Sequence, residues 1–84
     1  MSAEEILAGV REVAREHLGF TGELGLETRL VEDLALDSLR LVTLAAEVEN
    51  RFRVVLEPAD EAAIATIGDL VAVVARKLAA RGGA

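Results

Sequence analysis

Apolar residues recur at helical spacing in three separate segments of this chain, and this periodicity constrains the fold more than any other feature. The first segment covers residues 3 to 18, the second covers residues 38 to 52, and the third follows Thr66 and continues to Gly82-Gly83. Ala, Leu and Val dominate the hydrophobic content, and no segment alternates as a half-buried strand would. The sequence therefore predicts an all-α fold.

The ends of these segments carry residues that start and stop helices. Ser2 and Glu5 have the spacing of a capping box, and Gly19 is a suitable stop for the first helix. Thr66 is a suitable N-cap for the last helix, and a short helix is expected over residues 59 to 64. The prediction is a four-helix bundle of three longer helices and one short helix, with a long loop between the first two.

Length and charge narrow the classes of function. A chain of 84 residues can bury one modest core, so we expect residues 1–84 to form a single domain. We also expect a monomer. Fifteen acidic against nine basic residues argue against nucleic acid as a partner. The N-terminus lacks the layout of a signal peptide, no apolar stretch could span a membrane, and there is no cysteine, so we expect a cytoplasmic protein.

The long connection from Gly19 to Leu36 is lopsided in charge. Its leucines should hold it on the core, and residues 28 to 34 could form a helical turn. Arg29 is the only basic residue among the acids of this connection, which leads to Ser38. The leucines are Leu24, Leu26, Leu30 and Leu34, and the acids are Glu23, Glu27, Glu32, Asp33 and Asp37.

Asp37 and Ser38 stand where this loop ends and the second helix begins. The Asp37 carboxylate suits the N-cap position, where it can accept a hydrogen bond from an unpaired backbone N–H of the first turn. The Ser38 hydroxyl then lies beside the positive end of the helix dipole, which favours an attached phosphate. The same two residues are also an ordinary helix start, so the motif alone does not decide between the two interpretations.

The second helix has two apolar faces. One face should enter the core, and the other is formed by Leu39, Val42 and Ala46, which we call the Leu39 row. An exposed row of this kind indicates a docking surface, but the first or third helix could also cover it. The core face consists of Leu41, Leu44, Ala45, Val48 and Phe52.

Catalytic and metal-binding patterns are missing from the sequence. The only histidine, His17, has no acid-histidine cluster around it and should lie at the surface, so no metal site is expected. A serine hydrolase would require His17 to reach Ser38, and Ser38 does not lie in a G-x-S-x-G elbow. Two hypotheses outweigh it: a serine that another protein modifies, and a small acidic helical adaptor without a prosthetic group.

Residues 31 to 39 (VEDLALDSL), the helix ending at Phe52 and the Thr66-Ile67 helix start together resemble the acyl carrier proteins over nearly the whole chain. The resemblance implies that Ser38, between Asp37 and Leu39, carries 4'-phosphopantetheine. A phosphopantetheinyl transferase would attach this arm from coenzyme A with Mg²⁺, and acyl-loading and acyl-processing enzymes would then use its thiol. Such a protein is a carrier of thioester-bound acyl groups and not an enzyme.

The resemblance also implies where partners and cargo bind. Partner enzymes would contact the Leu39 row and the acids Glu32 and Asp33. The apolar interior could shelter an acyl chain as in some family members, although an ordinary packed core is equally compatible with these residues. The interior residues concerned are Leu41, Leu44, Val48, Phe52, Ile64, Ile67 and Leu70.

Two features depart from the fatty-acid carriers. The second helix there is strongly acidic, whereas residues 38 to 56 here have a net charge of +1. Leu36, before Asp37, is more like the polyketide-type carriers. We therefore expect a discrete carrier in fatty-acid-like, polyketide or other specialised biosynthesis, and these two features favour a specialised or polyketide-like pathway. The charged residues behind the first departure are Arg40, Arg51 and Arg53 with Glu47 and Glu49.

Overall fold

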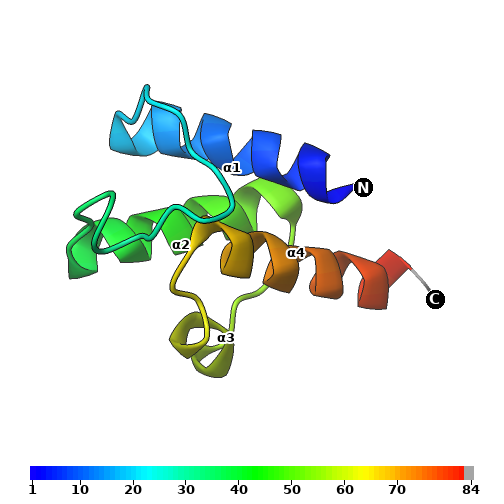
Figure 1. The fold of residues 1–84 in the computed structure, drawn as a ribbon. Coiled ribbons are helices and arrows are strands. Elements are labelled where there is room, and N and C mark those ends of the chain that lie inside the picture. Colours follow the sequence, from blue (N-terminus) through cyan, green and yellow to red (C-terminus); the bar gives the residue numbers. More distant parts are fainter. Residues whose placement is uncertain (83–84) are drawn as a thin grey trace.

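Four helices and no strand form the part of the chain that the computed structural model describes, residues 1–82. α1 packs against both α2 and α4 and runs in the opposite direction to them (Figure 1). The predicted all-α bundle is confirmed, while the expected stop at Gly83 lies outside the described residues. The helices are α1 (Ala3–Leu18), α2 (Ser38–Phe52), α3 (Pro58–Ala62) and α4 (Ile67–Gly82).

α1 begins and ends as the sequence predicts. The Ser2 hydroxyl accepts a hydrogen bond from the Glu5 backbone N–H at 3.2 Å, and the Glu5 carboxylate accepts one from the Ser2 N–H at 2.9 Å. This reciprocal pair satisfies two backbone donors that the first turn leaves open. Gly19 then ends the helix in the left-handed conformation, with φ 75°, which glycine adopts without steric cost.

α4 begins with the predicted cap at Thr66. The Thr66 hydroxyl accepts a hydrogen bond from the Asp69 backbone N–H at 3.0 Å. The Asp69 carboxylate in turn accepts hydrogen bonds from the backbone N–H groups of Ala65, at 2.9 Å, and Thr66, at 3.0 Å. The bonds from Ala65 and Thr66 lower the pKa of Asp69 because they favour its ionised form.

α3 starts and ends earlier than the predicted range of 59 to 64. Pro58 is its first residue, a position that proline suits because its missing N–H has no partner there anyway. The Asp60 carboxylate ties α3 to α4 through ion pairs with Arg76, at 2.7 Å, and Lys77, at 2.8 Å. These ion pairs hold α3 close to α4 (Figure 1).

The core combines one face of each long helix with leucines of the α1–α2 loop. Leu24, Leu30 and Leu34 are buried as predicted, but Leu26 is 50% exposed, contrary to the prediction. The reason is that Leu26 contacts α4 through its backbone, because its carbonyl oxygen accepts a hydrogen bond from the Gly68 N–H at 2.8 Å. A Cβ on Gly68 would lie 2.7 Å from that oxygen, so the close approach requires glycine.

Further backbone hydrogen bonds fix this loop to the start of α4. The Leu30 N–H donates to the Ala65 carbonyl at 3.0 Å, and the Ile67 N–H donates to the Thr28 carbonyl at 2.9 Å. The predicted helical turn within residues 28–34 is present as hydrogen-bonded turns in its second half. The loop is therefore held against the start of α4 at Thr28 and Leu30.

Candidate functional site

Ser38 is the first residue of α2 and is exposed. Asp37 is its N-cap, as predicted, because the Asp37 carboxylate accepts a hydrogen bond from the Arg40 backbone N–H at 2.9 Å. The positive end of the helix dipole lies at this point of the chain. An anionic group attached to the Ser38 oxygen would be stabilised there, and the oxygen is accessible to another protein.

The residues just before Ser38 are held against the core. Ala35 has a positive φ of 53°, an uncommon conformation for a residue with a Cβ. It precedes Leu36, whose side chain is buried and whose N–H donates to the Leu30 carbonyl at 3.2 Å. Since Leu36 is fixed, Asp37 and Ser38 leave the core at a defined place.

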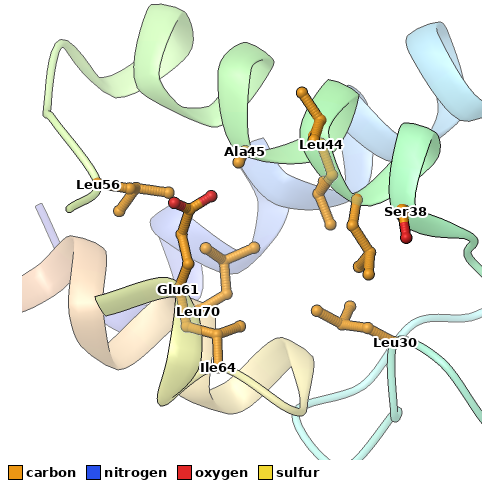
Figure 2. Close-up of a pocket in the computed structure, with 10 residues that line it drawn as sticks. Leu30, Ser38, Leu44, Ala45, Leu56, Glu61, Ile64 and Leu70 are labelled. Atoms are coloured by element: carbon orange, nitrogen blue, oxygen red, sulfur yellow. The ribbon is translucent and has the colours of Figure 1, made fainter. Parts of the chain in front are cut away.

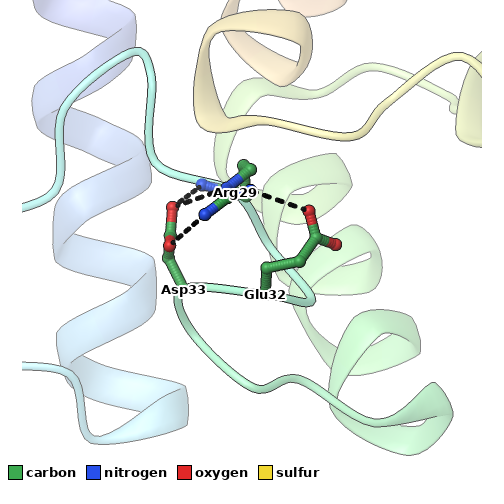
Figure 3. A network of polar contacts seen from close by, with 3 residues as sticks. All are labelled: Arg29, Glu32 and Asp33. Atoms are coloured by element: carbon green, nitrogen blue, oxygen red, sulfur yellow. Dashed lines mark hydrogen bonds and ion pairs between the residues drawn. The ribbon is translucent and has the colours of Figure 1, made fainter.

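Arg29 forms ion pairs with two acids of the loop before Ser38 (Figure 3). It pairs with Asp33 at 3.2 Å and with Glu32 at 3.7 Å, and its backbone N–H also donates to Asp33 at 2.8 Å. The Arg29 side chain and then its N–H lower the pKa of Asp33. Both predicted partner-facing acids are exposed. Asp33 makes the shorter ion pair with Arg29 and also accepts its backbone hydrogen bond, whereas Glu32 makes only the longer ion pair.

A pocket of about 270 Å³ lies between α2, α3 and α4, with Ser38 at its edge (Figure 2). We call it the Ser38 pocket. Four residues of the expected apolar interior line it, namely Leu41, Leu44, Ile64 and Leu70. The volume is near the lower end of small-molecule sites, which span about 300 to 1,000 Å³. The other lining residues are Leu30, Val42, Ala45, Leu56 and Glu61.

Three residues of the predicted interior do not line this pocket. Val48, Phe52 and Ile67 are instead buried in the general core. Phe52 faces α1, where a Cβ on Gly9 would lie 2.5 Å from the end of its ring. Sequence reasoning missed the contribution of Leu30, Leu56 and Glu61, because each comes from a loop or from the short helix.

The Leu39 row is open to solvent. Leu39 is 75% exposed, Val42 is 62% exposed, and Ala46 is also exposed. Neither α1 nor α3 covers them, which decides between the two alternatives left by the sequence. The row starts next to Ser38, and Val42 also contributes to the Ser38 pocket. An exposed apolar row of this kind is suited to binding another protein.

His17 does not approach Ser38. Its Nε2 atom lies 3.4 Å from the Glu47 carboxylate, about 13 Å along α2 from Ser38 at 1.5 Å per residue. A Ser-His-Asp arrangement is therefore not formed between these residues. Within residues 1–82, no group of three or more His, Cys, Asp or Glu side chains could hold a metal ion. In the same range, no helix is long and apolar enough to cross a membrane.

The sequence matches a family model described as the phosphopantetheine attachment site, over residues 8–74. It is 38% identical over 78 residues to an acyl carrier protein of Thermotoga maritima, an alignment that covers 92% of this chain and 96% of that one. An acyl carrier protein of Exiguobacterium sp. is 35% identical over 79 residues, with 93% and 100% covered.

Two mycobacterial proteins are also similar. The meromycolate extension acyl carrier protein of Mycobacterium bovis is 37% identical over 73 residues, which cover 86% of this chain but only 64% of that longer protein. A solved structure from Mycobacterium tuberculosis, assigned to the acyl carrier proteins, superposes with a TM-score of 0.79 at 28% identity. It covers 84% of this chain and 96% of its own.

Proposed function

Because this chain belongs to the acyl carrier protein family, we propose that Ser38 is the residue that carries its 4'-phosphopantetheine arm. Members of this family carry acyl groups and are not catalysts. The observation that supports Ser38 is its exposed hydroxyl at the start of α2, on the edge of an apolar pocket. When bound, the arm supplies a terminal thiol on which an acyl group is held as a thioester.

The residues around Ser38 suit a phosphodiester at that oxygen. The unpaired N–H groups and the dipole at the start of α2 favour its negative charge. Asp37 maintains this helix start through its cap, and Leu39 begins the surface that a transferase would contact. A phosphopantetheinyl transferase, with coenzyme A and Mg²⁺, is the partner required for the attachment.

The Ser38 pocket is the proposed shelter for the carried acyl group. Its walls are largely apolar, and burial of an alkyl chain there gains about 25 cal/mol per Å² of apolar surface removed from water. Leu44 of α2 faces Ile64 and Leu70 across it (Figure 2), and Leu41 also lines it. The pocket volume favours short carried groups.

Partner enzymes dock on the Leu39 row in this proposal. They load and process the acyl group while contacting Leu39, Val42 and Ala46, with Glu32 as the more available acid of the approach. Asp33 contributes less because Arg29 holds it. The basic residues of α2 support a discrete carrier in a specialised or polyketide-like pathway, whose partners do not require an acidic second helix.

We further propose one carrier domain over residues 1–84, which acts as a monomer in the cytoplasm and binds no nucleic acid. The net charge of -6 opposes binding to a phosphate backbone. The absence of cysteine from the chain is compatible with a reducing compartment.

The attachment is tested by incubation with coenzyme A, Mg²⁺ and a promiscuous phosphopantetheinyl transferase, followed by intact mass measurement. We expect the mass to rise by one phosphopantetheine group in the natural protein and to stay unchanged in Ser38→Ala. Ser2 is the only other serine, so Ser2→Ala is the matched control and should still be modified. An unmodified natural protein, or a modified Ser38→Ala variant, would contradict the proposal.

A further inference from the structure

The Ser38 pocket contains one ionisable side chain that the proposed function does not use. Ser38 and Glu61 are the polar members of its lining, and the rest are aliphatic. Figure 2 shows them at opposite ends of the pocket, with the Glu61 carboxylate between Leu56 and Ala45 and above Leu70. A group attached at Ser38 that extends through the pocket would therefore meet a carboxylate at its far end.

The Glu61 carboxylate has acceptor capacity that no side chain of residues 1–82 takes up. The nearby cations of α4, Arg76 and Lys77, are both bound by Asp60, the residue before Glu61. Glu61 itself is exposed, so water solvates its carboxylate when the pocket is empty of cargo. Whatever enters this end of the pocket replaces some of that water.

The chemistry of the entering group then matters. An alkyl end would remove water from the carboxylate without returning a hydrogen bond, which is unfavourable. A donor would return one, and a protonated amine would form a charge-assisted hydrogen bond, which is shorter and stronger than a neutral one. Extending the proposed function, we propose that the acyl group carried on Ser38 bears a hydrogen-bond donor, most favourably a protonated amine, that binds Glu61.

Two amide-linked coenzyme A analogues of matched shape test this inference. One delivers an ω-aminohexanoyl arm and the other a heptanoyl arm, in which a methyl group replaces the ammonium group. Each is loaded onto the natural protein, Glu61→Gln and Glu27→Gln, and the Tm of each product is measured. Glu27→Gln is the charge-matched control, since Glu27 is exposed in the α1–α2 loop and does not line the pocket.

We expect Glu61→Gln to lower the Tm of the aminohexanoyl form by about 4 °C more than that of the heptanoyl form, a shift that is resolvable for a domain of this size. Glu27→Gln should change both forms equally. Equal changes in Glu61→Gln would overturn the inference, because the amine would then make no specific contact with Glu61.

The mass of each product separates this inference from the proposed function. If Ser38 gains the arm but the two cargoes respond alike, the carrier function stands and the role of Glu61 is refuted. If the natural protein gains no arm, the proposed attachment fails and the inference fails with it.

Discussion

Replacement of Asp37 by alanine should lower the free energy of unfolding by about 1 kcal/mol. The change removes the acceptor that lies 2.9 Å from the Arg40 N–H, together with a negative charge at the positive end of the α2 dipole. The site is exposed, so water can take over the freed N–H, and the loss stays below that of a buried unpaired donor. For a domain of this size it corresponds to a fall in Tm of about 4 to 8 °C.

Thermal and urea unfolding of the natural protein, Asp37→Ala and Asp37→Asn measure this effect. Asparagine keeps an oxygen acceptor in nearly the same place and is a good N-cap, so Asp37→Asn should retain most of the stability. Loss in the alanine variant alone supports the hydrogen bond as the cause. An unchanged Tm in Asp37→Ala would refute the reasoning that this cap fixes the start of α2 and the place of Ser38.

Three further substitutions test the packing of Gly68 against the α1–α2 loop, the loss of stability in acid, and the Leu39 row. Gly68→Ala should cost about 1 to 3 kcal/mol through its clash with the Leu26 carbonyl, whereas Gly22→Ala, which meets open space, should not lower the Tm by overpacking. The backbone hydrogen bonds to Asp69 lower its pKa in the folded protein below the value of about 3.9 expected in the unfolded chain. Their contribution to stability is therefore complete above about pH 3.9, and it is lost as the pH falls through the pKa of the folded state. Asp69→Asn should therefore reduce the loss of Tm below about pH 4 in acid titrations. Val42→Asp should change the free energy of unfolding by no more than about 0.5 kcal/mol, because Val42 is exposed. It should slow arm attachment by a transferase if the Leu39 row is the surface that the transferase contacts. An unchanged rate would exclude the row from that contact.

The features that sequence reasoning predicted correctly are determined by neighbouring residues. Ser2 with Glu5 and Thr66 with Asp69 satisfy each other within one turn, so their spacing is enough to place a helix start. Asp37 is a cap for the same reason. This cap makes Ser38 the first residue of α2.

The features that sequence reasoning missed depend on segments that meet only in the folded chain. Leu26 looks like a core leucine in the sequence, but its backbone approaches Gly68, more than forty residues away along the chain, and its side chain remains outside. Leu30, Leu56 and Glu61 come together at the Ser38 pocket from two loops and the short helix. No periodicity links them, so the pocket lining could not be read from spacing.

The charged side chains of α2 make contacts that a count of charges in the sequence does not show. Glu47 lies against His17 at 3.4 Å, and the Glu49 carboxylate accepts a hydrogen bond from the Leu56 N–H at 2.7 Å. Arg51 pairs with Glu12 at 2.7 Å.

These contacts engage both acids of α2, whereas Arg40, near Ser38, is exposed next to the Leu39 row. Both acids lie in the second half of α2, whereas Arg40 lies near its start, so the net charge of +1 over residues 38 to 56 does not show where the charges stand relative to the Leu39 row. A partner that places an acid opposite Arg40 gains from it, and one that places a base there is repelled. In the proposed docking on the Leu39 row, the position of Arg40, and not the total charge of the helix, would therefore favour some partner enzymes over others.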